Sequence, residues 1–244
     1  DTKPVFQRLD HMGAYHNPEL YPYAAMSDGD HRLIRAAYGA MVELIDDQVG
    51  RVLDALEATG QREQTLVLFM SDHGELLGDH GLYLKGPYFY EPSIRVPLIV
   101  SWPGVIAPGV VDDLVELVDV APTLMEAAGL PVPSRMQGHS LWPRLMGQTD
   151  VDVREDVYCA YYNAMPWHRE PAAHATMVRT RSHKLVAFHG LNTGELYDLD
   201  ADPNETHNLW DDPECRDLKL EMYTRLCDRM AWTVDPMPPR QSDW

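Results

Sequence analysis

The sequence has few cysteines. Its 244 residues include three, Cys159, Cys215 and Cys227, which are too few and too odd in number for a disulfide framework. We expect Cys215 and Cys227 on one helix, about 18 Å apart at 1.5 Å per residue, so they cannot bond to each other. The sequence therefore predicts free thiols, and it favours a reducing compartment such as the cytoplasm.

Positive charge and long apolar runs are also scarce. Lys and Arg number 20 against 38 Asp and Glu, a formal charge of -18, which repels nucleic-acid phosphates and anionic membrane surfaces. No apolar run approaches the roughly 20 residues needed to cross a membrane, and no signal peptide opens the sequence. We expect a soluble protein without nucleic-acid or membrane partners, in which a site for a small anionic ester needs its own local positive charge.

An apolar run at positions 66–70 ends abruptly at Ser71, Asp72, His73 and Gly74. The run is too short for most helices, so we interpret it as a buried parallel strand. Open α/β sheets bind ligands at the carboxyl ends of such strands. Asp72 and His73 are therefore the best candidates for chemistry in the chain.

Asp72 and His73 offer one hard oxygen and one imidazole nitrogen. This pair suits a divalent cation such as Mn²⁺, Zn²⁺ or Ca²⁺. We expect Gly74 to let the backbone turn sharply, so that both side chains can face one ion. The structural alternative is that Asp72 caps the next turn and His73 is hydrogen-bonded at the surface.

The first part of the chain, 1–145, reads as an α/β domain with a mostly parallel sheet covered by helices. Positions 1–30 read as a loop. An amphipathic helix is predicted over 30–58, with Asp28 or Asp30 as N-cap and Gly60 past its end. A second strand is predicted over 96–102, and a helix capped by Asp119 over 119–128.

The second part, 146–244, predicts a small antiparallel sheet and one helix. Candidate strands lie at 157–162, 175–180, 183–188 and 195–198. A helix begins near Asp212 and runs to about residue 231, with Leu218, Met222, Leu226 and Met230 on its inner face. The tail at 233–244 cannot be a helix, and we expect it to lie over a neighbouring subunit in a homo-oligomer or over the body of the protein.

The segment 71–104 resembles the sulfatase branch of the alkaline phosphatase superfamily. It reads SDHGELLGDHGLYLKGPYFYEPSIRVPLIVSWPG. This branch includes arylsulfatases, choline and iduronate sulfatases, and the related phosphonate monoester hydrolases. Further matches lie at 35–57, 117–129, 137–141 and 194–209, so the resemblance covers nearly all of 32–209. It implies an alkaline phosphatase-like α/β fold, incomplete in this chain.

The resemblance implies roles for individual residues. Asp72 and His73 correspond to ligands of one divalent metal ion, Ca²⁺ or Mn²⁺ with Zn²⁺ as the alternative. Lys85, thirteen positions after Asp72, corresponds to a lysine that contacts sulfate or phosphate oxygens. His80, in GDHG, is expected to be structural or outside the ligand set. His16, in HNPELYP, matches a motif whose His is a candidate leaving-group acid, although its spacing to the next helix argues against that role.

Sulfatases use a formylglycine made from a Cys or Ser in a CxPSR-like motif, and this sequence contains no such motif. We therefore expect the nucleophile in a missing N-terminal part and expect the isolated chain to be inactive. Three functions stay open. They are a sulfuric ester hydrolase, a phosphonate or phosphate ester hydrolase of the same superfamily, and a non-catalytic interaction module if this chain is the whole gene product.

Overall fold

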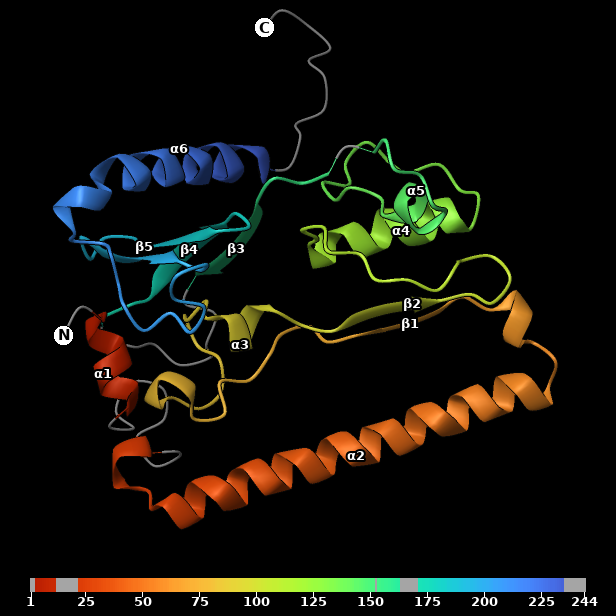
Figure 1. Cartoon of the computed structure of the whole chain (residues 1–244), viewed down its shortest axis with the longest axis horizontal. Coiled ribbons are helices and arrows are strands. Elements are labelled where there is room, and N and C mark those ends of the chain that lie inside the picture. Colours follow the sequence, from red (N-terminus) through yellow and green to blue (C-terminus); the bar gives the residue numbers. More distant parts are fainter. Residues whose placement is uncertain (1–2, 12–21, 152, 163–170, 235–244) are drawn as a thin grey trace, which may run out of the picture.

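A computed structural model describes residues 3–11, 22–151, 153–162 and 171–234. The helices are α1 (Val5–His11), α2 (Asp28–Ala58), α3 (Glu91–Ile94), α4 (Val120–Ala127), α5 (Trp142–Leu145) and α6 (Arg216–Trp232). The strands are β1 (Val67–Met70), β2 (Leu98–Ser101), β3 (Val157–Tyr162), β4 (His174–Arg179), β5 (His183–Phe188) and β6 (Thr193–Asp198). Figure 1 shows α6 over one side of the β3–β6 sheet, with α1 on the other side and α2 extended along the opposite end of the molecule.

The predicted strands β1 and β2 are present, but their parallel arrangement is not what the structure shows. They form a two-stranded antiparallel sheet, with Val67 opposite Ser101 and Met70 opposite Leu98. A parallel pair needs a crossover connection, usually a helix, whereas the chain between β1 and β2 is mostly loop around the four-residue α3. Phe69 and Met70 are also exposed rather than buried. The α/β content is therefore confirmed, and a mostly parallel sheet is not.

The predicted C-terminal antiparallel sheet and helix are confirmed. Strands β3, β4, β5 and β6 pair in sequence order, each antiparallel to the next. The face that carries Val178, Leu185 and Leu196 packs against α6, where Met222 and Leu226 are buried and Leu218 and Met230 lie beside them. Each buried side chain of this size stabilises the fold by about 1.5–3 kcal/mol.

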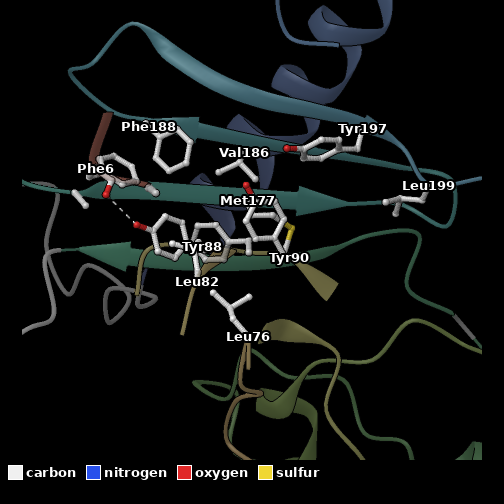
Figure 2. Packing of buried hydrophobic residues seen from close by; sticks show 13 residues of the cluster. Phe6, Leu76, Leu82, Tyr88, Tyr90, Met177, Val186, Phe188, Tyr197 and Leu199 are labelled. Atoms are coloured by element: carbon white, nitrogen blue, oxygen red, sulfur yellow. Dashed lines mark hydrogen bonds between the residues drawn. The ribbon is translucent and has the colours of Figure 1, made fainter. Parts of the chain in front are cut away.

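The other face of the β3–β6 sheet packs on the loop that follows β1. Met177, Val186, Phe188 and Tyr197 from the sheet share one core with Phe6 of α1 and with Leu76, Leu82, Tyr88 and Tyr90 from the loop (Figure 2). This core joins residues from both sides of the predicted boundary at 145, which itself stays a prediction. It fixes the loop that carries the candidate site against a rigid sheet.

Two details near the N-terminus differ from the predictions. Residues Val5–His11 form the helix α1 instead of loop, and Phe6 is fully buried there. The N-cap of α2 is Ser27 rather than Asp28 or Asp30, because the Ser27 hydroxyl accepts from the Asp30 N–H while the Asp30 carboxylate accepts from the Ser27 N–H. This reciprocal pair is a capping box. Helix α2 has no buried residue.

The helix after β2 also differs in its cap. Asp119 stands at the N-cap position of α4, but its side chain does not cap that helix. The carboxylate instead accepts from the Glu116 and His139 N–H groups and pairs with Arg154. Asp119 therefore ties α4 to the segment that leads into β3.

Cys159, Cys215 and Cys227 are all free, as predicted. Within the described part of the chain, no helix combines the length and apolar character that a membrane span requires. His16 and residues 235–244 of the tail lie outside the described residues.

Candidate functional site

Asp72 and His73 lie just after β1, separated from it by Ser71, and their side chains lie near each other. The His73 N–H donates to Oδ1 of Asp72 (3.0 Å), and Nε2 of His73 is 3.5 Å from Oδ2 of Asp72. Nδ1 of His73 lies 2.8 Å from the Gly74 carbonyl, which can only accept, so Nδ1 carries the proton. Nε2 of His73 therefore has a free lone pair and lies beside the Asp72 carboxylate. Desolvation raises the pKa of Asp72, but the neighbouring His73 ring, backbone hydrogen bonds to the carboxylate and the charge of Lys85 lower it below its ordinary value.

Gly74 holds this turn against α3, for a reason other than the one predicted. Its φ lies outside the left-handed region, so glycine is not needed there for an unusual backbone conformation. A Cβ on Gly74 would stand 1.8 Å from the Pro92 carbonyl oxygen. Glycine is required because the two backbones approach this closely, and the Gly74 N–H donates to the Ser93 carbonyl (2.8 Å).

Lys85 returns to His73 because residues 75–84 form a closed loop. The Glu75 carboxylate accepts from the N–H groups of Leu77 (3.1 Å) and Leu84 (2.6 Å), and Leu76 N–H donates to the Leu84 carbonyl (2.9 Å). Leu76 and Leu82 are buried beneath the loop. Leu77 and Leu84 have positive φ angles of 51° and 66°, which are uncommon for such residues and cluster at functional sites.

The ammonium of Lys85 donates to Nε2 of His73. Asp72, His73 and Lys85 therefore meet, and all three line one groove together with Tyr88, Glu91 and Ser93. The groove has a volume of about 2280 Å³, more than the roughly 300–1,000 Å³ of an ordinary ligand pocket. It is open, and both Asp72 and Lys85 are exposed in it.

Asp72 and His73 are ligand types that suit a divalent cation, but these two ligands are fewer than such an ion needs. Oδ2 of Asp72 lies 3.5 Å from Nε2 of His73, and the Lys85 ammonium donates to the same nitrogen as the local cation. The Gly74 carbonyl fixes the His73 tautomer, as outer partners of metal-binding histidines do. No group of three or more His, Cys, Asp or Glu side chains suited to a metal occurs in the described residues. Further ligands would have to come from elsewhere.

His80 lies apart from the pair. Its ring stacks on Tyr90, with ring centroids 3.6 Å apart and planes within 10°. Burial, helped by the charges of Lys3 and Lys184, lowers the pKa of His80 to about 4. The ring is therefore neutral near pH 7 and packs against the loop core, in keeping with the structural role expected for it.

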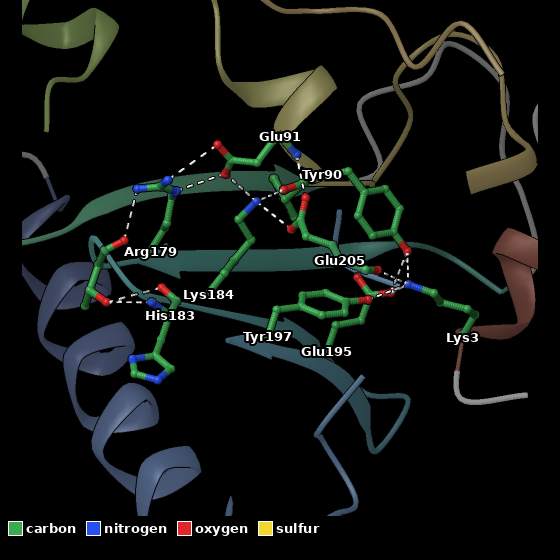
Figure 3. Close-up of polar contacts among 11 residues, drawn as sticks. Lys3, Tyr90, Glu91, Arg179, His183, Lys184, Glu195, Tyr197 and Glu205 are labelled. Carbon is green, nitrogen blue, oxygen red and sulfur yellow. Dashed lines mark hydrogen bonds and ion pairs between the residues drawn. The ribbon is translucent and has the colours of Figure 1, made fainter. Parts of the chain in front are cut away.

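A buried polar network behind the groove fixes α3 to the C-terminal sheet (Figure 3). The fully buried Lys184 ammonium bonds to Glu205 (2.7 Å), Glu91 (2.8 Å) and the Phe89 carbonyl (2.9 Å). Arg179 adds a second bond to Glu91 (2.9 Å). Desolvation raises the pKa of Glu91, but the charges and hydrogen bonds of Lys184 and Arg179 lower it below its ordinary value. Burial raises the pKa of Glu205.

The network continues through Lys3, which joins Tyr90, Tyr197 and Glu195. The sequence reasoning missed these residues because a lysine or glutamate in a strand is normally solvated. A signal was present in β5 and β6. Lys184 lies two and four residues before Val186 and Phe188, and Glu195 lies two residues before Tyr197. All of them are therefore on the sheet face that packs against the loop. A charged residue in that register is buried and needs a partner.

Two family models match the chain. The model described as "Sulfatase" matches residues 8–130. The model described as "N-sulphoglucosamine sulphohydrolase, C-terminal" matches residues 78–231. Together they cover the site loop, both small sheets and most of α6.

Individual relatives agree with these models. The chain is 37% identical over 197 residues to an N-acetylglucosamine-6-O-sulfatase of Bacteroides thetaiotaomicron, covering 78% of this chain and 34% of the relative. It is 38% identical over 186 residues to a choline-sulfatase of Rhizobium meliloti, covering 75% and 34%. The crystal structure of the phosphonate monoester hydrolase of Agrobacterium radiobacter superposes with a TM-score of 0.78 at 30% identity, covering 86% and 44%. The chain thus spans about a third of the length of these curated relatives.

Proposed function

This chain belongs to the sulfatase family, and on that premise we propose that it forms the metal and substrate-oxygen side of a site that hydrolyses a small sulfuric ester. The meeting of Lys85 with Asp72 and His73 at the end of β1 is the observation that supports the proposal most directly. One cation, one anionic oxygen and one imidazole nitrogen lie together in an open groove. Such a constellation suits an anionic ester held beside a metal ion.

Each residue has a proposed role. Asp72 and His73 hold one divalent ion, with Ca²⁺ or Mn²⁺ proposed first, which offsets negative charge on the transferred group when bound. Lys85 donates to a non-bridging oxygen of the sulfate, where its charge counters the charge that develops during transfer. Gly74 and the Glu75 loop position these groups and take no part in the chemistry. The formylglycine nucleophile and the missing metal ligands are supplied by polypeptide outside this sequence.

Sulfate ester hydrolysis is placed first because the family models and the curated relatives described above are sulfatases. Hydrolysis of a phosphonate monoester is the second candidate, and the structural likeness to the Agrobacterium radiobacter enzyme favours it. The same three side chains suit either ester, because both present non-bridging anionic oxygens.

The test compares the turnover of an aryl sulfate and an aryl phosphonate monoester by the complete enzyme and by its Asp72→Asn variant. We expect sulfate to be the better substrate and the variant to lose both activity and bound metal. Faster turnover of the phosphonate would favour the second candidate. Full activity and metal content in Asp72→Asn would refute the site.

A further inference from the structure

The backbone of the candidate site is held against α3. The Gly74 N–H donates to the carbonyl of Ser93 (2.8 Å), which is itself buried. Nδ1 of His73 donates to the Gly74 carbonyl (2.8 Å), so the same glycine orients the ring. The direction of the His73 imidazole therefore depends on where α3 lies.

Helix α3 does not cap its own N-terminus. It has four residues, and the side chain of its N-cap residue, Tyr90, makes no capping hydrogen bond. The first N–H groups of a helix have no partner within the helix and need one elsewhere. The Glu91 N–H donates to Oε2 of Glu205 (2.7 Å), 114 positions later in the chain. A carboxylate from the turn that follows β6 therefore does the work of the missing cap.

Glu205 is itself held in an unusual position. It is 1% exposed and has a φ of 54°, a conformation that a residue other than glycine keeps only where its surroundings enforce it. The Glu205 N–H donates to the Asp202 carbonyl (3.0 Å). The Asp202 carboxylate accepts from the Thr206 hydroxyl (3.0 Å) and the His207 N–H (2.7 Å). The turn at 202–207 therefore fixes the Glu205 carboxylate in place.

The second oxygen of Glu205 serves the same segment. Oε1 accepts from the Lys184 ammonium (2.7 Å), which also donates to the Phe89 carbonyl (2.9 Å), two residues before α3 (Figure 3). One carboxylate thus accepts from the first N–H of α3 and from the lysine that holds the residues before it. A side chain without these two oxygens would leave the Glu91 N–H without its acceptor, which costs free energy in a partly buried place.

We propose that Glu205 is a positioning residue of the candidate site, because it holds α3 and, through Ser93 and Gly74, sets the direction of the His73 ring. Glu205 lies behind α3, so its effect on a bound ion is transmitted through the backbone. Nε2 of His73 then points to one place, where it binds a divalent ion more tightly than a mobile ring would. The part of the proposal that concerns the ion rests on the proposed function.

The test compares Glu205→Ala with Asp119→Ala in this chain. Asp119 is the matched control, because its carboxylate is also 1% exposed, accepts from two backbone N–H groups and pairs with an arginine, but ties α4 to the segment before β3. Nuclear magnetic resonance of the ¹⁵N-labelled folded chain follows the two ring nitrogens of His73 at about pH 8, where imidazole is neutral. Titration with Mn²⁺, followed by water-proton relaxation, gives the affinity.

We expect the two ¹⁵N resonances of His73 to move towards each other in Glu205→Ala, because the ring no longer keeps one tautomer. The affinity for Mn²⁺ should fall at least fivefold. Asp119→Ala should keep the wild-type resonances and affinity, although it also loses a buried carboxylate. Glu205→Gln serves where the alanine variant does not fold. Its amide oxygen can accept from only one of the two donors, so both changes should appear at smaller size.

Wild-type His73 resonances in the folded Glu205 variants would overturn the proposal, and so would equal changes in Asp119→Ala. Failure of the proposed function has a different signature. A wild-type chain that binds no Mn²⁺ would refute the metal-binding role of Asp72 and His73, whereas the ring resonances would still show whether Glu205 positions His73.

Discussion

The ammonium of Lys85 lies against Nε2 of His73, twelve residues earlier in the chain. The Gly74 carbonyl holds the proton of His73 on Nδ1, so Nε2 is the free acceptor. Oδ2 of Asp72, 3.5 Å from the same nitrogen, adds a negative charge beside it. A divalent ion bound by Asp72 and His73 would replace the ammonium at Nε2, and Lys85 would then be free to reach an oxygen of the substrate.

Replacing Lys85 tests whether this residue binds the substrate while Asp72 and His73 bind the metal ion. In the complete enzyme, Lys85→Ala should lower kcat by about 100-fold or more, as loss of one donor to a developing anion does, while bound metal by elemental analysis stays near the wild-type amount. Lys219→Ala, on α6, is the control and should keep its turnover. Unchanged turnover in Lys85→Ala would refute the role, and equal loss of metal would make Lys85 a structural support instead.

The same geometry predicts competition between Lys85 and a cation on this chain. A positive charge beside a metal ion opposes its binding, so Lys85→Ala should bind Mn²⁺ more tightly than the wild-type chain does. His73→Ala should bind it more weakly, because Nε2 is lost. Titration followed by water-proton relaxation measures both affinities. Weaker Mn²⁺ binding in Lys85→Ala would contradict the placement of the ammonium at the ion's position.

Gly74 offers a test of how the turn after β1 is built. Gly74→Ala drives a Cβ into the Pro92 carbonyl, so it should lower the free energy of unfolding by about 1–3 kcal/mol, as overpacking does. Gly39→Ala, inside α2 with nothing within 4 Å of the new Cβ, should raise it by about 0.5–1 kcal/mol. Urea unfolding measures both, and a neutral Gly74→Ala would show that the two backbones can separate freely.

Much of the fold could be predicted, because it depends on local patterns. Short candidate strands joined by polar turns gave β3 to β6, and Leu218, Met222 and Leu226 gave the inner face of α6. The direction of the β1–β2 pairing could not be predicted from the run at 66–70, because short apolar runs look alike in parallel and antiparallel sheets. Pairing depends on the path of the 27 residues between the strands, and that path follows side-chain contacts rather than a period.

The candidate site shows the same division. Asp72 and His73 could be found because they end a strand, and Lys85 came from the family resemblance. The contact between Lys85 and His73 depends on Glu75 and on the left-handed Leu77 and Leu84, which no periodic pattern indicates. The proposed roles of these residues stay predictions. The contacts of the tail and the role of His16 also stay predictions.

Lys184 is the centre of the network that supports α3. Lys184→Met would leave Glu91 and Glu205 without their shared cation, and breaking a buried pair in this way costs about 3–5 kcal/mol. The loss should depend on pH. Without the Lys184 charge, which lowers the pKa of Glu205, burial raises that folded pKa further above the ordinary value of 4.5, while Arg179 still pairs with Glu91. The variant's stability is therefore fully present below pH 4.5 and falls as pH rises.

The difference between wild type and Lys184→Met should therefore be large at pH 7 and shrink towards pH 4. Urea unfolding at several pH values measures it. Arg225→Met is a suitable control, because Arg225 pairs with Glu155 and Asp156 near the surface and exposed pairs contribute about 0–1 kcal/mol. A penalty independent of pH would show that Lys184 acts through packing alone.

His80 gives a pH dependence of the opposite sign. Its pKa falls from 6.5 in the unfolded chain to about 4 when folded, so the unfolded chain takes up a proton first as pH drops. The stability that this shift contributes is present above pH 6.5 and is lost between pH 6.5 and 4.

His80→Phe keeps a ring on Tyr90 but binds no proton. We expect the unfolding free energy of the variant to fall less steeply over that range, by the share due to His80. Because the carboxyl groups titrate in both proteins, the difference between the two curves isolates the histidine. Parallel curves would mean that the ring of His80 leaves the Tyr90 stack and becomes protonated in solvent before the fold is lost.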